Sequence, residues 1–230
     1  MKKFLITVAL STIVMMCTQA QVYIQGGVNF ANITRDNNGN TEKNNVLGTF
    51  NAGIMGRLGL SRMLDVESGL LLSGRGSKAE TYFNGGNDYV KSRFSPVYLE
   101  LPVNAVVKIP MGGGSSIFFH GGPYVAMGLW GKSSQETKVG PLITSSSNNI
   151  KFNNDDPFTS DQEDAAYDKL KRFDFGLNLG GGFEFNHFIL KANYGLGFTK
   201  INSTESDNNA NDKNKYRTVS VSVGIPIGKL

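Results

Sequence analysis

The residues best placed to do chemistry are single charged side chains within stretches that otherwise alternate apolar residues with small or polar ones. They are Arg57, Asp65, Glu67, Arg75, Glu100, Lys108, Asp174, Glu184 and Lys191. Each lies on the non-apolar side of its stretch, so all of them would share one face of a folded sheet. Charges removed from bulk water must be paired. We therefore expect Arg57, Glu67, Arg75, Glu100, Lys108, Glu184 and Lys191 to form an interior polar network. Its role is either structural or that of a gate for ions.

Nucleophilic hydrolysis is the second chemistry to weigh. It needs a serine, a histidine and an acid within hydrogen-bond reach. The chain has two histidines, His120 and His187. Ser116 precedes His120 by four residues on the same side of an extended stretch, about 13 Å away at the rise of a strand, which is too far for a hydrogen bond. Other serines could approach across strands, so a lipid-modifying enzyme dependent on His120 stays an alternative, although we expect no enzyme.

We expect no cofactor and no metal. The segment Asn153–Asp164, NNDDPFTSDQED, is rich in oxygen ligands that could hold Ca²⁺, but it lacks the spacing and central glycine of an EF-hand. We interpret it as a solvated loop. Two GGG runs, Gly112–Gly114 and Gly180–Gly182, do not open a helix after a strand, so neither is a phosphate loop. The first fits a turn, and the second would let crowded strands approach.

The first twenty residues read as a cleaved secretory signal peptide. Lys2 and Lys3 precede an apolar run, Phe4–Met16, that is too short to span a membrane, and the small-x-small sequence TQA follows. We expect the mature chain to begin at Gln21. The alternative is a lipoprotein with Cys17 as its lipid-bearing residue, but no small residue precedes it at the required place.

The rest of the chain, 21–230, is expected to form one domain. It contains no cysteine, which excludes disulfides and thiol chemistry. The formal charge is +4 for the whole chain and falls to +2 without the two N-terminal lysines, which argues against a nucleic-acid partner. The mean hydropathy of −0.21 suits a soluble protein, or a membrane β-barrel whose polar interior offsets its apolar exterior.

Strict alternation predicts the strands that carry these residues. The eight alternating stretches are Val22–Phe30, Phe50–Leu60, Leu64–Gly76, Val97–Ile109, Ile117–Leu129, Phe173–Phe185, Phe188–Phe198 and Val219–Ile227. Short connections alternate with long polar ones. The short ones are Ser61–Met63, Pro110–Ser115 and Asn186–His187, and the long ones are Thr34–Asn45, Lys78–Phe94, Lys132–Arg172 and Asn202–Lys215. A capping box at Ser160 predicts a short helix over Asp161–Lys171.

This sorting of connections predicts an eight-stranded, antiparallel, up-and-down transmembrane β-barrel with both chain ends in the periplasm. A soluble barrel with its apolar side inward shows the same period, so other features must decide. The apolar sides carry no charge, and the other sides are rich in glycine and serine rather than lysine and glutamate. Phenylalanines stand at both ends of the strands, and Phe173 to Phe185 rises about 30 Å, which fits two interfacial girdles. Leu71, Tyr98, Phe118 and Tyr124 should narrow the interior.

Four segments carry a resemblance to a known family. VYIQGGVNFANI, SPVYLELPVNAVVKI, FHGGPYVAMGLWGK and RFDFGLNLGGGFEF closely resemble the PorT-like outer-membrane β-barrel family, often called porin family proteins, of Bacteroidota. The resemblance covers nearly all of Val22–Ile227. It implies the outer membrane of a Gram-negative bacterium, the membrane's lipid and the assembly machinery as partners, and, by analogy alone, a role in protein secretion.

For function, we expect a structural or surface-interaction barrel whose long extracellular loops meet a ligand or partner. A small-solute porin or narrow channel is the alternative, and a lipid-modifying enzyme comes third. Eight strands leave an interior just wide enough for side chains to fill.

Overall fold

The computed structural model describes residues 21–37, 40–43, 46–153, 169–199, 201 and 215–227. Three sequence-based expectations lie wholly or almost wholly outside these residues: the signal peptide over 1–20, the lipoprotein alternative at Cys17, and the solvated loop Asn153–Asp164 with its calcium-binding alternative. In the described part of the chain, no helix is long and apolar enough to cross a membrane. The fold is all-β, and its main sheet is antiparallel throughout.

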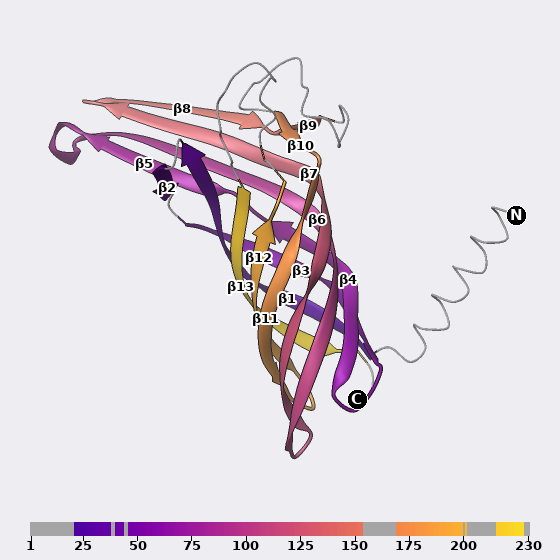
Figure 1. Ribbon diagram of the computed structural model, residues 1–230. Helices are drawn as coiled ribbons and strands as arrows, with labels where there is room; N and C mark the ends of the chain where they lie inside the picture. The colour runs from indigo at the N-terminus through magenta and orange to yellow at the C-terminus, as the bar shows by residue number, and fades with distance from the viewer. Residues whose placement is uncertain are drawn as a thin grey trace, which may run out of the picture.

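Eight strands pair in a closed ring (Figure 1). They are β1 (Gln21–Asn37), β3 (Leu47–Gly59), β4 (Leu64–Gly74), β6 (Asp88–Gly112), β7 (Ser115–Val139), β11 (Phe173–Glu184), β12 (Ile189–Gly197) and β13 (Lys215–Pro226). Each strand pairs with the ring strands next to it along the chain. The ring closes where β1 pairs with β13, from Tyr23 opposite Pro226 to Thr34 opposite Lys215. Every alternating stretch of the sequence corresponds to one of these strands.

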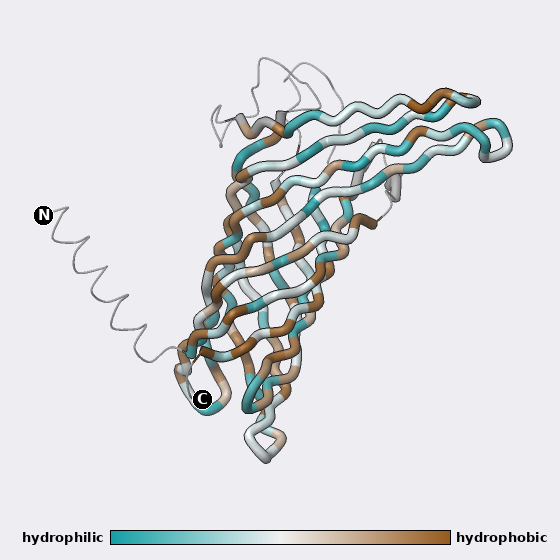
Figure 2. Tube along the Cα trace, turned by 180° about the vertical axis from the view of Figure 1, so that it is seen from behind, coloured by the Kyte–Doolittle hydropathy of each residue, from teal (hydrophilic) through white to brown (hydrophobic). Residues whose placement is uncertain are grey.

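The two faces of the ring differ as the alternation predicts. Apolar side chains cover the outside, where Ile24, Ile54 and Leu179 each keep more than half of their surface exposed. Figure 2 shows brown, hydrophobic segments along the strands of the barrel body. At the end with the short turns, Phe183, Phe185 and Phe188 stack in sequence, with ring centroids 6.4 and 4.6 Å apart. The outer face therefore matches a bilayer core with aromatic residues at its boundary.

The long connections were predicted as loops, and for three of them this is wrong, because they contain strands. Lys78–Phe94 forms a hairpin from β5 (Ser77–Phe83), the short η1 (Asn84–Gly86) and the first part of β6. The segment from Lys132 continues β7 and returns as β8 (Leu142–Asn149). β5, β8 and the adjoining parts of β6 and β7 make a four-stranded sheet that extends beyond the ring (Figure 1). We call this sheet, residues 77–94 and 132–149, the ribbon. A smaller hairpin joins β1 to β2 (Asn40–Lys43).

The predicted helix over Asp161–Lys171 is wrong at its last three residues. Lys169–Lys171 form strand β10, which pairs in parallel with β9 (Lys151–Asn153), and the rest of the predicted helix lies outside the described residues. Leu170 is 1% exposed and belongs to an apolar cluster with Ile150 and Ile201. Burial of Leu170 at the barrel mouth is a tertiary contact that a local capping pattern does not report.

Candidate functional site in the barrel interior

The first group of buried charges lies toward the short turns, and we call it the turn-side cluster. Arg57 of β3 stands opposite Glu67 of β4 in the strand register, and its Nη2 lies 2.7 Å from Glu67 Oε2. Arg57 Nη1 lies 2.5 Å from Glu184 Oε2 on β11, across the interior. Lys191 of β12 pairs with Glu67 as well. Glu67 is fully buried, so these contacts replace the water that its carboxylate has lost.

Further partners complete the turn-side cluster. Lys108 Nζ lies 2.7 Å from Asp65 Oδ2 and 3.8 Å from Glu184 Oε1. The Tyr23 hydroxyl donates to Glu67 Oε2 at 2.7 Å. Arg57 also stacks on an aromatic ring, with its guanidinium carbon 4.6 Å from the Phe118 centroid. Strands from all round the ring therefore meet at one charge network.

The second group lies toward the ribbon, and we call it the mouth-side cluster. Arg75, in the short break between β4 and β5, is 3% exposed. Its Nη2 lies 2.7 Å from Glu100 Oε2, and its Nη1 pairs with Asp174. The Tyr124 hydroxyl donates to Asp174 Oδ2 at 2.9 Å. The Asn178 amide donates to Glu100 Oε1 at 3.0 Å, so both carboxylates have more than one partner.

Three tyrosine rings surround the Arg75 guanidinium. Its central carbon lies 5.1, 4.8 and 5.6 Å from the centroids of Tyr98, Tyr124 and Tyr216. A desolvated guanidinium gains from facing aromatic rings in this way. The three tyrosines are buried as well, and the Tyr98 and Tyr216 rings pack edge to face with centroids 5.6 Å apart, so the mouth-side cluster fills the interior with aromatic side chains as well as charge.

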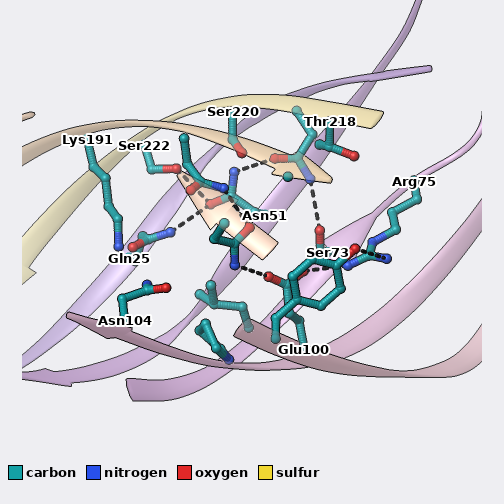
Figure 3. A pocket seen from close by; sticks show the side chains of 17 residues that line it. Gln25, Asn51, Ser73, Arg75, Glu100, Asn104, Lys191, Thr218, Ser220 and Ser222 are labelled. Carbon is teal, nitrogen blue, oxygen red and sulfur yellow. Dashed lines mark hydrogen bonds and ion pairs between the residues drawn. The ribbon is translucent and has the colours of Figure 1, made fainter. Parts of the chain in front are cut away.

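Between the two clusters lies a small polar cavity of about 40 Å³. Figure 3 shows its lining, with Gln25, Asn51 and Ser222 on one side and Arg75 and Glu100 on the other. Amides and hydroxyls line it and bond to one another: the Ser222 hydroxyl donates to Asn51 Oδ1 at 2.9 Å, and Asn51 Nδ2 donates to Asn29 Oδ1 at 2.7 Å. A space of this size accommodates only a few water molecules.

All seven residues expected in the interior network face the interior and are ion-paired. The structure divides them into two groups: Arg57, Glu67, Lys108, Glu184 and Lys191 at the turn side, and Arg75 and Glu100 at the mouth side. Sequence reasoning missed Tyr216 because the predicted strand began at Val219, three residues later in the chain. The even-numbered side of that strand, continued backward through Ser220 and Thr218, would have included it.

His120 is buried, and among the described residues neither of its ring nitrogens has a hydrogen-bond partner. Its ring lies 6.2 Å from the Phe118 ring. Ser116 stands opposite Glu184 in the strand register, toward the short turns. The structure therefore brings neither a serine nor an acid into hydrogen-bond contact with His120. Among the described residues, no group of three His, Cys, Asp or Glu side chains is arranged to hold a metal ion.

The second GGG run provides space for these side chains. A Cβ on Gly182 would lie 2.8 Å from Phe118 Cζ, and one on Gly180 would lie 2.5 Å from His120 Nε2. Both glycines face inward from β11 in the narrow part of the barrel, where larger residues would clash.

A second candidate site lies on the ribbon. A cleft of about 600 Å³ is lined by one side of β5 to β8 and by the start of β3. Its charged residues are Lys78, Glu80, Lys91, Arg93 and Glu136, and the others are mostly serines. On the same face, the Tyr89 hydroxyl donates to Glu136 Oε1 at 2.7 Å, and the Tyr82 hydroxyl donates to Glu80 Oε2 at 2.9 Å. These bonds raise the pKa of each tyrosine, and the bond from Tyr82 is the main cause of a lowered pKa at Glu80.

The ring with an apolar exterior and an ion-paired interior agrees with the family comparison. Residues 18–203 match a family described as the outer membrane protein beta-barrel domain. The chain belongs to this family. It is a multi-pass β-barrel of the outer membrane, as the apolar exterior requires. No curated protein matches the chain.

Solved structures give only distant similarity. Ail, the attachment invasion locus protein of Yersinia pestis, is 16% identical, with 91% of this chain and 99% of that chain covered and a TM-score of 0.40. Neisserial surface protein A is 10% identical, with 90% and 97% covered and a TM-score of 0.41. The translocator domain of the autotransporter NalP from Neisseria meningitidis is 10% identical, with 98% and 96% covered and a TM-score of 0.29. Similarity at this level does not bear on function.

Proposed function

We propose that the protein is a closed barrel with a structural or surface-interaction role, in which the ring anchors the ribbon on the outside of the cell. The observation that supports this role is the filled interior. Arg57 and Arg75 lie at two levels of the same narrow lumen, each held by two carboxylates from different strands. A solute would have to displace both arginines from their partners.

The energetic cost of such an opening argues against the alternative of a small-solute porin. Removing one partner of a buried ion pair typically costs about 3–5 kcal/mol, and two such levels stand in series here. The cavity between them is about 40 Å³, far below the size of a sugar or amino-acid path. The ribbon, in contrast, exposes most residues of its outer strands, as a recognition surface would.

Single-channel recording in planar bilayers tests the proposal, with refolded protein from Gln21 to Leu230. Heat-modifiable gel mobility first establishes that the barrel has folded. A folded barrel should be electrically silent. Steady ohmic openings whose ion selectivity changes on charge reversal at Arg57 or Glu100 would instead establish a channel. Lys78→Glu, on the ribbon, is the matched control for that second outcome. If openings occur, their ion selectivity should be the same in this variant as in the unmodified protein.

A further inference from the structure

The free edge of the ribbon supports an inference that rests on the proposed function and specifies the strand that a partner would contact. β8 is the last strand of the sheet and, among the described residues, pairs with β7 alone. All eight of its residues are exposed. Alternate residues of an edge strand direct their N–H and C=O groups away from the sheet, so β8 presents a row of unpaired backbone donors and acceptors.

The sequence of β8 does nothing to block this edge. LITSSSNN contains no charged residue and no proline, the two features that usually prevent a foreign strand from adding to an edge. The opposite edge of the ribbon differs. β5 carries Lys78 and Glu80, whose side chains form an ion pair of 3.6 Å. The β5 edge of the sheet thus carries charged side chains, whereas the β8 edge carries none.

We propose that β8 binds an extended segment of another protein by strand addition, so that the partner's backbone continues the ribbon. Only an extended polypeptide can pair with a row of alternating backbone donors and acceptors. The middle of the edge is Ser145–Ser147, whose small side chains leave room beside the strand for large β-branched or aromatic residues of the partner. Recognition would therefore depend on the main chain more than on particular side chains.

The position of the edge decides between a foreign segment and a second copy in the same membrane. Figures 1 and 2 both show β8 as the strand of the ribbon farthest from the short turns. Barrels in one membrane differ only by rotation about the membrane normal, and such a rotation leaves an edge that points away from the membrane pointing away from it. We therefore expect the β8 edges of neighbouring copies not to face each other. The partner must approach from outside the cell.

Disulfide capture of a synthetic strand tests the proposal. The chain from Gln21 onward has no cysteine, so a single one can be introduced. Ser146 on β8 and Ser92 on β6 both stand opposite Gln135 of β7, and both are exposed, so they form a matched pair. Ser146→Cys lies on the open edge, whereas Ser92→Cys lies on a strand that already has neighbours on both sides.

The probe is the uncharged peptide TVTVCVTVT, added under mild oxidation to protein refolded in phosphatidylcholine vesicles. We expect Ser146→Cys to capture it at least about tenfold faster than Ser92→Cys, because a docked strand raises the effective concentration of its thiol. Hydrogen exchange gives the second readout. In the unmodified protein, the peptide should slow exchange at alternate amides of Leu142–Asn149, a pattern that side-chain adhesion would not produce.

Equal capture at the two positions, or no change in β8 exchange, would overturn the proposal. So would disulfide dimers of Ser146→Cys formed without peptide, because the edge would then belong to a second copy. The bilayer recordings are independent of these results. A silent barrel that takes up no peptide refutes strand addition alone, and a conducting barrel that takes up the peptide refutes only the closed lumen.

Discussion

Arg75 lies where a single substitution should be most costly. Arg75→Met retains a long side chain between Tyr98 and Tyr124 but leaves Glu100 and Asp174 without their cation. We expect the free energy of unfolding to fall by about 3–5 kcal/mol, because two carboxylates then stay buried without a cation. Equilibrium unfolding in urea, with the protein in lipid vesicles, measures the loss.

Two controls separate buried charge from lost packing at this site. Combining Arg75→Met with Glu100→Gln and Asp174→Asn should restore most of the stability, because no unpaired charge then remains. Lys78→Met removes a partly exposed cation from the ribbon and should change the unfolding free energy by less than about 1 kcal/mol. If the triple variant is no more stable than the single one, the loss comes from packing.

Gly180 tests how tightly the interior is packed. A Cβ at this position would enter the space held by His120 and by the backbone of β12. We expect Gly180→Ala to lower the unfolding free energy by about 1–3 kcal/mol, the usual cost of overpacking. Gly26→Ala on β1 is the matched control, since no atom of the described residues would lie within 4 Å of a Cβ added there. Urea unfolding of both variants should show a loss for the first only.

Within the ribbon, the contact between β5 residues Glu80 and Tyr82 predicts a measurable titration. The Tyr82 hydroxyl donates to the Glu80 carboxylate, which raises the pKa of Tyr82 above its ordinary value of 10.0. Glu80→Gln should therefore lower the pKa of Tyr82 toward that value. Glu136→Gln should instead lower the pKa of Tyr89. NMR titration of ¹³Cζ-labelled tyrosine measures both, and if Glu80→Gln leaves the Tyr82 pKa unchanged, the hydrogen bond does not form.

The signs of the two shifts define the pH range in which this contact stabilises the ribbon. The lowered pKa of Glu80 contributes stability that is present above its unfolded value of 4.5 and is lost as pH falls through the folded value. The raised pKa of Tyr82 contributes stability that is present below 10.0 and is lost as pH rises through the folded value. The contact should be strongest between those limits.

The ring and the ribbon differ in how much of them the sequence could predict. A ring strand such as β11 has lipid on one side and packed side chains on the other, so Phe175, Leu177 and Leu179 alternate with polar residues. The strands β5 and β8 have water on both sides, so their sequences have no hydrophobic period, and composition alone suggested loops. Alternation also placed Arg57 and Glu184 in the interior. Their contact depends on how strands distant in sequence are arranged around the ring, which no local pattern specifies.

At the scale of the whole molecule, the two ends of the barrel have different structures. One end has tight turns, such as Phe185–Phe188, closed by a backbone bond of 2.9 Å from Phe185 N to Phe188 O. The other end carries the ribbon and the mouth-side cluster around Arg75. An interior closed at two levels and a sheet that extends beyond the ring both support the proposal that the ribbon is the functional part of the protein.

Orientation in the membrane is therefore the last prediction. The ribbon should lie outside the cell and the short turns in the periplasm, as in other outer-membrane barrels. In intact cells, a membrane-impermeant maleimide should label Ser92→Cys on the ribbon. It should label His187→Cys, in the exposed turn after β11, only once the outer membrane has been permeabilised. Because the chain from Gln21 onward has no natural cysteine, any label on the purified protein reports the introduced cysteine alone. Labelling of His187→Cys but not of Ser92→Cys in intact cells would show that the barrel has the opposite orientation, with the ribbon in the periplasm.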